Sequence, residues 1–121
     1  MSARILVADD DPTIRRLMTV FLKTLGYTPV VAADGREALA TALADPPDLV
    51  ISDIQMPELG GLELTRRLRE EPSFAKVPIL LFSASIGQAE EDLWRGAGAD
   101  GFVVKPPTLA TLRETLSGLL G

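Results

Sequence analysis

The chain has 121 residues, of which 46% are hydrophobic and 24% charged, a composition typical of one globular domain with a substantial core. Because it contains neither cysteine nor histidine, disulfides, cysteine nucleophiles, histidine bases and thiolate or imidazole metal sites are excluded. The net charge of -5 argues against direct binding to nucleic acid, and the lack of a signal-peptide or transmembrane pattern predicts a cytoplasmic protein with no membrane partner.

Short apolar runs alternate along the chain with stretches in which apolar residues recur every three or four positions. The first pattern predicts buried strands and the second predicts amphipathic helices. In chain order we expect strand 5–8, helix 12–25, strand 29–32, helix 35–45, strand 49–52, helix 61–71, strand 77–82, helix 88–97, strand 102–104 and helix 109–121. This alternation predicts an α/β fold with a doubly wound, mostly parallel sheet and right-handed crossovers.

Particular residues mark several of these boundaries. Asp11 and Pro12 suit the N-cap and the first turn of the first helix, and Thr108 suits the N-cap of the last. Pro29 favours an edge position for the second strand, because proline cannot donate a backbone hydrogen bond. Gly60-Gly61 predicts a flexible joint before the third helix.

Helical periodicity also predicts which side chains face the core. We expect Leu39 and Leu43 of the second helix, and Leu93 of the fourth, to point inward. Arg69 is expected among the polar positions of the third helix. The fourth helix has the weakest apolar face, and its glycines lower its intrinsic stability.

Polar side chains follow four of the five strands at the point where each strand ends. They are Asp9 and Asp10, then Asp53, Ser83 and Lys105. In an open parallel sheet the carboxyl ends of the strands border one crevice, so we expect these side chains to converge. Clustered carboxylates repel one another unless a cation is bound, and a ligand set without nitrogen or sulfur suits a hard cation such as Mg²⁺.

Some of these residues have a simpler explanation when each is taken alone. Asp11 is a good helix cap, Ser83 is an ordinary strand-end hydroxyl, and Lys105 is an ordinary surface charge. Their coincidence at the strand ends gives them weight. An aspartate carboxylate can attack a phosphoryl group, and a metal ion, an ammonium and a hydroxyl can stabilise the charge during transfer. The residues therefore predict an aspartyl phosphate site centred on Asp53.

Four separated segments, each at a predicted strand end, resemble the receiver domains of bacterial two-component response regulators, of the chemotaxis-regulator type. They are Ala8-Asp9-Asp10-Asp11, Ser52-Asp53-Ile54-Gln55-Met56-Pro57, Phe82-Ser83-Ala84 and Val104-Lys105-Pro106. The resemblance covers essentially the whole chain. It implies one receiver domain over residues 1–121, with a flavodoxin-like (βα)5 fold and strand order 2-1-3-4-5.

The resemblance implies that Asp53 accepts a phosphoryl group from a histidine kinase or a phosphotransfer protein. Mg²⁺, for which Mn²⁺ can substitute, would be held by Asp9, Asp10, Asp53 and the backbone carbonyl of Gln55. Lys105 would pair with a phosphate oxygen.

The switch residues implied by the resemblance are Ser83 and Phe102. Ser83 would contact another phosphate oxygen, and Phe102 would change rotamer as Ser83 moves. The peptide bond between Lys105 and Pro106 would be cis. Ser83 stands where threonine is common in the family, and Phe102 lacks the phenolic hydroxyl that some members carry.

The resemblance further implies a signalling switch that is not an enzyme in the ordinary sense, because it catalyses only its own phosphorylation and dephosphorylation. Output would pass to a partner protein or domain through the fourth helix, fifth strand and fifth helix. The protein would be a monomer or a phosphorylation-dependent dimer.

Two other functions are compatible with parts of the pattern. One is a receiver-like scaffold that binds partners without being phosphorylated. The other is a small Mg²⁺-dependent phosphohydrolase of the haloacid-dehalogenase type, but that family typically has a second aspartate where this chain has Gln55. Nucleotide binding is not expected, because neither a GxGxxG nor a GxxxxGK[ST] pattern follows a strand.

Overall fold

The computed structural model describes residues 2–84 and 88–120, and within these residues strands and helices alternate as predicted. The strands are β1 (Arg4–Ala8), β2 (Thr28–Ala32), β3 (Leu49–Asp53), β4 (Ile79–Ser83) and β5 (Gly101–Val104). The helices are α1 (Pro12–Thr24), α2 (Gly35–Ala44), α3 (Gly61–Arg69), the short 3-10 helix η1 (Pro72–Phe74), α4 (Gln88–Ala97) and α5 (Leu109–Leu120). None of the described helices is long and apolar enough to cross a membrane.

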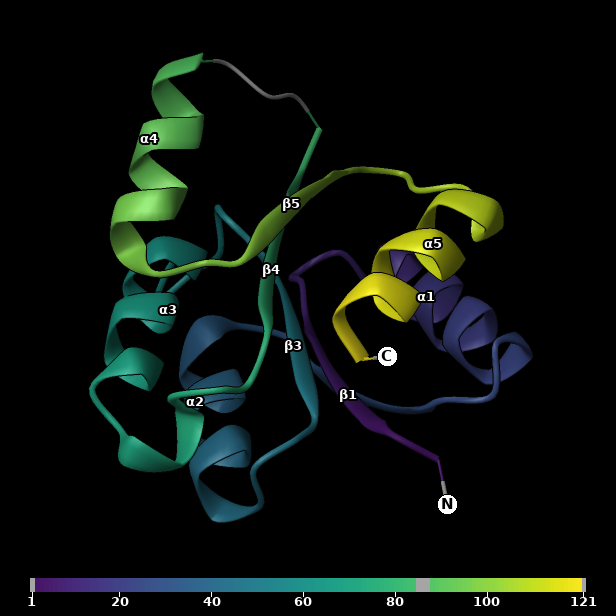
Figure 1. Ribbon diagram of the computed structural model, residues 1–121, viewed down its shortest axis with the longest axis horizontal. Helices are drawn as coiled ribbons and strands as arrows, with labels where there is room; N and C mark the ends of the chain where they lie inside the picture. The colour runs from purple at the N-terminus through teal and green to yellow at the C-terminus, as the bar shows by residue number, and fades with distance from the viewer. Residues whose placement is uncertain (1, 85–87, 121) are drawn as a thin grey trace.

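The strands form one parallel sheet in the order β2-β1-β3-β4-β5. Helices α1 and α5 cover one face, and α2, α3 and α4 lie on the other side (Figure 1). This arrangement confirms the predicted doubly wound fold and its strand order. The second strand is at an edge, as Pro29 predicted. The strand order reverses between β1 and β3. Sheets of this kind bind ligands in the crevice outside the carboxyl ends of the strands at such a reversal.

Each face of the sheet packs on its own set of buried helix residues. On the α1 and α5 side these are Met18, Leu22, Leu112 and Leu116. On the α2 and α3 side they are Ala38, Ala42, Leu64 and Leu68. The central strands are covered on both faces and are therefore apolar along most of their length, and polar residues follow where β1, β3 and β4 end.

The helix boundaries predicted from capping residues are confirmed. The side chain of Asp11 accepts a hydrogen bond from the backbone N of Thr13 at 2.9 Å, and that of Thr108 accepts one from the N of Thr111 at 3.0 Å. Gly26 follows α1 with a φ of 91°, a conformation that glycine adopts at little cost. Asp11 therefore fixes the start of α1 directly after the two aspartates at the end of β1.

Two side chains lie elsewhere than the periodicity predicted. Leu43 and Leu93 are 45% and 51% exposed, so the prediction that they point inward was wrong. In α2 the residues that face the sheet are the small Ala38 and Ala42, which leaves Leu43 on the flank of the helix. Leu39 is partly buried and packs against the core, as predicted.

The glycine pair before α3 has a packing role that its sequence did not indicate. Gly61 is buried, and a Cβ at this position would overlap the carbonyl oxygen of Asp53. Gly60 is the N-cap of α3. Gly61 therefore allows α3 to start directly against the end of β3, which fixes the backbone of Asp53.

Candidate functional site

The predicted site residues converge at the carboxyl edge of the sheet. Asp53 is the last residue of β3, Ser83 is the last residue of β4, and Lys105 follows β5. A cavity of about 500 Å³ opens there. It is lined by Asp10, Asp53, Gln55, Met56, Pro57, Ser83, Ala84 and Lys105. Apart from the buried Asp9 and the switch candidate Phe102, every predicted site residue lines this cavity.

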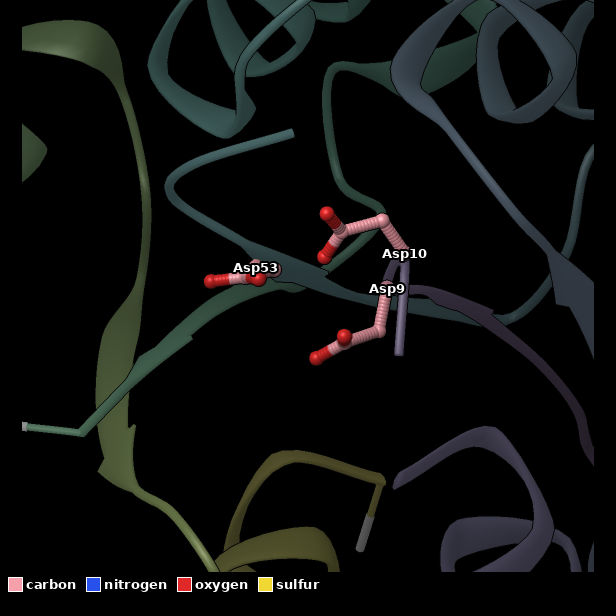
Figure 2. A group of neighbouring side chains, drawn as sticks. All are labelled: Asp9, Asp10 and Asp53. Atoms are coloured by element: carbon pink, nitrogen blue, oxygen red, sulfur yellow. The ribbon is translucent and has the colours of Figure 1, made fainter. Parts of the chain in front are cut away.

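The carboxylates of Asp9, Asp10 and Asp53 form a compact group. One oxygen from each lies within 4.8 Å of the others, and Figure 2 shows the three side chains gathered at the strand ends. Asp9 and Asp53 are buried, whereas Asp10 is exposed. Three carboxylates this close carry more negative charge than one lysine can balance, and their oxygens are the ligands that Mg²⁺ prefers. The residues present therefore fit a divalent cation.

Lys105 bridges two of these carboxylates. Its Nζ lies 2.8 Å from Oδ2 of Asp9 and 3.0 Å from Oδ2 of Asp53. The Lys105-Pro106 peptide bond is cis, as the resemblance implied. Burial alone would lower the pKa of the Lys105 ammonium, but the hydrogen bonds to Asp9 and Asp53 outweigh it and raise the pKa. Lys105 is therefore a fixed positive charge at the site.

The pKa of the Asp53 carboxyl is set mainly by the burial of the side chain. Burial raises the pKa of Asp53, the hydrogen bond from Lys105 opposes the rise, and the charge of Asp9 adds to it. Asp53 Oδ1 also faces the backbone N of Gln55 at 3.4 Å, a weak interaction at most. Asp53 is therefore a largely desolvated carboxylate whose one strong contact is the Lys105 ammonium, and its oxygens face the cavity where a phosphoryl group can approach.

Asp9 is held by donors at three different atoms. Its Oδ2 binds Lys105, its Oδ1 accepts from the backbone N of Asp11 at 2.9 Å, and its carbonyl oxygen accepts from Nη1 of Arg15 at 2.8 Å. The sequence interpretation missed Arg15. The available signal was its position, since a long basic side chain in the first turn of α1 can reach back to the loop that carries the aspartates.

The two switch candidates occupy different places. Ser83 is half-buried and lines the cavity. Phe102 does not line it, because it lies on the edge strand β5 and packs on Trp94 of α4, with ring centroids 6.4 Å apart. The register of β4 and β5 pairs Leu81 with Phe102, two residues before Ser83. The two candidates are thus on neighbouring strands.

Comparison with known proteins identifies the family to which this arrangement belongs. The model of the response regulator receiver domain matches residues 5–117. The chain belongs to this family. The receiver domain is 40% identical, over 99% of its own length, to the response regulator MprA of Mycolicibacterium vanbaalenii, and it covers 51% of that protein. It thus spans about half the length of this relative.

Solved structures agree with this assignment. The receiver domain superimposes on the chemotaxis protein CheY4 of Vibrio cholerae with a TM-score of 0.94 and 34% identity, covering 98% of this chain and 99% of that one. It also matches the receiver domain of a sensor histidine kinase from Pseudomonas aeruginosa PAO1, with a TM-score of 0.92, 28% identity and coverage of 100% and 99%. That second structure has a magnesium ion coordinated in its active site cleft. The predicted family and fold are confirmed, and the chain is a receiver domain of two-component signalling.

Proposed function

We propose that this receiver domain accepts a phosphoryl group on Asp53 in a Mg²⁺-dependent reaction and thereby changes the surface that it offers to an output partner. The arrangement around Asp53 supports this proposal. A buried carboxylate faces a cavity, a lysine ammonium lies 3.0 Å away, and two more carboxylates have an oxygen within 4.8 Å. Phosphoryl transfer needs mainly positioning and charge stabilisation, which this set of groups can supply.

In this proposal Asp9, Asp10, Asp53 and the backbone carbonyl of Gln55 hold Mg²⁺, for which Mn²⁺ can substitute. The ion would offset the surplus negative charge and bind a phosphoryl oxygen. The donor is a phosphohistidine of a histidine kinase or a phosphotransfer protein. An Asp53 oxygen bonds to phosphorus while the bond from phosphorus to the histidine nitrogen breaks.

Two side chains then stabilise the transferred group. The Lys105 ammonium, already 3.0 Å from Asp53, offsets the charge of one phosphoryl oxygen. The Ser83 hydroxyl donates a hydrogen bond to another. To make this hydrogen bond, Ser83 moves toward the phosphoryl group, and Phe102 changes rotamer as Ser83 moves. Phosphorylation thereby shifts the balance between two arrangements of the same fold.

The output face in this proposal consists of α4, β5 and α5. Leu93 of α4 and Val104 of β5 are both about half exposed on these elements, so the face offers apolar contacts to an output protein or domain. Residues 1–121 act as one receiver domain in the cytoplasm, as a monomer or a phosphorylation-dependent dimer. The domain is a signalling switch whose only reactions are its own phosphorylation and dephosphorylation.

Intact-mass measurement after incubation with Mg²⁺ and acetyl phosphate tests this proposal. Wild-type protein should gain one phosphoryl group, and Asp53→Asn should gain none. Asp34→Asn is the matched control, because Asp34 is an aspartate that caps α2 away from the cavity, and it should gain the group like wild type. An adduct retained in Asp53→Asn would contradict the assignment. Rapid turnover of a phosphate ester would instead favour a hydrolase, and failure to bind Mg²⁺ would favour a scaffold.

A further inference from the structure

Arg15 connects helix α1 to the loop that carries the acidic cluster. It lies in the first part of α1, is half-buried, and donates from Nη1 to the carbonyl oxygen of Asp9 at 2.8 Å. Its neighbour Arg16 is exposed. The two arginines therefore have the same charge and adjacent backbone positions, but only Arg15 is bonded to the loop among the contacts of the described residues.

The acceptor of this bond belongs to the peptide unit that joins Asp9 to Asp10. A peptide unit is planar, so fixing its carbonyl also fixes the direction in which the chain continues to Asp10. The Asp9 side chain is anchored separately, by Lys105 and by the backbone N of Asp11. Asp10, in contrast, is exposed. The bond from Arg15 is thus a direct means of setting where the Asp10 carboxylate lies relative to that of Asp9.

We propose that Arg15 is a positioning residue for the metal site, and that it acts by holding the Asp9-Asp10 peptide in the orientation that brings the two carboxylates together. This inference rests on the proposed function, in which these carboxylates hold Mg²⁺. Outer groups that orient metal ligands commonly change metal affinity roughly 10- to 100-fold when they are removed. Arg15 has this relation to Asp9 and Asp10.

The sign of the effect separates positioning from simple electrostatics. Arg15 carries a positive charge close to the acidic cluster, and that charge repels Mg²⁺. If Arg15 acted only through its charge, its removal would tighten Mg²⁺ binding. If it positions the peptide, its removal weakens Mg²⁺ binding even though a repulsive charge has been lost.

Isothermal titration with Mg²⁺ of the wild type, Arg15→Met and Arg16→Met tests this inference. Methionine keeps an unbranched apolar stem without the guanidinium and favours helix, so both variants should fold with most stem contacts preserved. We expect the Kd of Arg15→Met for Mg²⁺ to rise roughly tenfold. We expect the Kd of Arg16→Met to stay equal to the wild-type value or to fall slightly. A Kd of Arg15→Met equal to or below that of Arg16→Met would overturn the inference.

Arg15→Lys tests whether the hydrogen bond carries the effect. Lysine keeps the charge and one donor group, so its Kd should lie between those of wild type and Arg15→Met. Equal values for Arg15→Lys and Arg15→Met would argue against the hydrogen bond.

Hydrogen exchange of the Asp11 amide in the presence of a chelator provides a readout without metal. This amide donates to the Asp9 side chain, so loss of the Arg15 bond should speed its exchange several-fold, while Arg16→Met should leave it unchanged. Unchanged exchange in Arg15→Met would contradict the positioning role. If the wild type binds no Mg²⁺, the proposed function fails, and the exchange comparison still decides whether Arg15 holds the loop.

Discussion

Arg69 and Lys105 are both largely buried cations, with side chains 21% and 17% exposed, and both join segments that are far apart in the sequence. Arg69 lies at the end of α3. Its guanidinium donates to the carbonyls of Phe74, Val77 and Gly98 and to the carboxylate of Asp100. Each of its nitrogens has a partner, and its one charged partner balances its charge.

Around Lys105 the charges do not balance. Its single ammonium contacts Asp9 and Asp53, and the carboxylate of Asp10 lies in the same group. The cluster therefore keeps a surplus of negative charge, next to a cavity that can admit a ligand. Both clusters pair one basic side chain with aspartate, but they differ in how completely the charges and hydrogen bonds are balanced. The Arg69 cluster is neutral and fully hydrogen-bonded, as expected of a group that stabilises the fold, whereas the Lys105 cluster keeps carboxylates that a cation can neutralise.

The largest expected effect is on the Arg69 cluster. Arg69→Met removes its hydrogen bonds and leaves Asp100 without its cation, so we expect the free energy of unfolding to fall by about 3 kcal/mol. Urea unfolding with and without Mg²⁺ should give the same loss, because this cluster contains no metal site. Recovery of stability in Mg²⁺ would break the distinction between the two clusters.

A smaller effect is expected at Lys105, and it should depend on the metal. Lys105→Met removes the ammonium between Asp9 and Asp53, which should lower the free energy of unfolding by about 2 kcal/mol in a chelator. Saturating Mg²⁺ should restore most of this loss, because the ion supplies positive charge to the same carboxylates. The same urea titrations measure both values, and a loss that Mg²⁺ leaves unchanged would argue against a metal site here.

The smallest effect should be a gain in stability. Burial raises the pKa of Asp53 above its ordinary value of 3.8, so its ionised form is disfavoured in the folded protein. Asp53→Asn should therefore raise the free energy of unfolding slightly at neutral pH in a chelator. Asp100→Asn is the matched control, and it should lower stability because it weakens the bond to Arg69. If Asp53→Asn and Asp100→Asn changed the free energy of unfolding in the same direction, the two clusters would not differ in the way described.

The gain at Asp53 should also follow pH with a definite sign. Between 3.8 and the raised pKa, the folded protein keeps a proton that the unfolded chain has lost, so this group lowers stability as pH rises through that window. The stability difference between Asp53→Asn and wild type should grow from acid to neutral pH and then stay constant. A difference that shrinks as pH rises would show that the pKa shift has the other direction.

Much of the fold was predictable because local signals agreed with one another. The apolar runs, the caps at Asp11 and Thr108 and the edge proline Pro29 each fixed an element or its place. The convergence of Asp53 and Lys105 followed from a rule about parallel sheets, which places strand ends together whatever their separation along the chain.

The remaining features depend on contacts that periodicity does not encode. The helical pattern places Arg69 among the polar positions of α3. Its guanidinium nevertheless donates hydrogen bonds to backbone carbonyls of η1 and of two loops. Phe74 lies in a stretch that we expected to be a loop, and it is fully buried in the core. The need for Gly61 arises from the approach of α3 to the backbone of Asp53. Each depends on how elements meet in three dimensions.

The separation of 96 residues between Asp9 and Lys105 has a consequence for the growing chain. At roughly 5–20 residues per second, a ribosome adds Lys105 about 5–20 s after Asp9. Until then the acidic residues at the ends of β1 and β3 can meet without the ammonium that later separates their charges. The acidic part of the site is therefore synthesised well before the side chain that balances part of its charge.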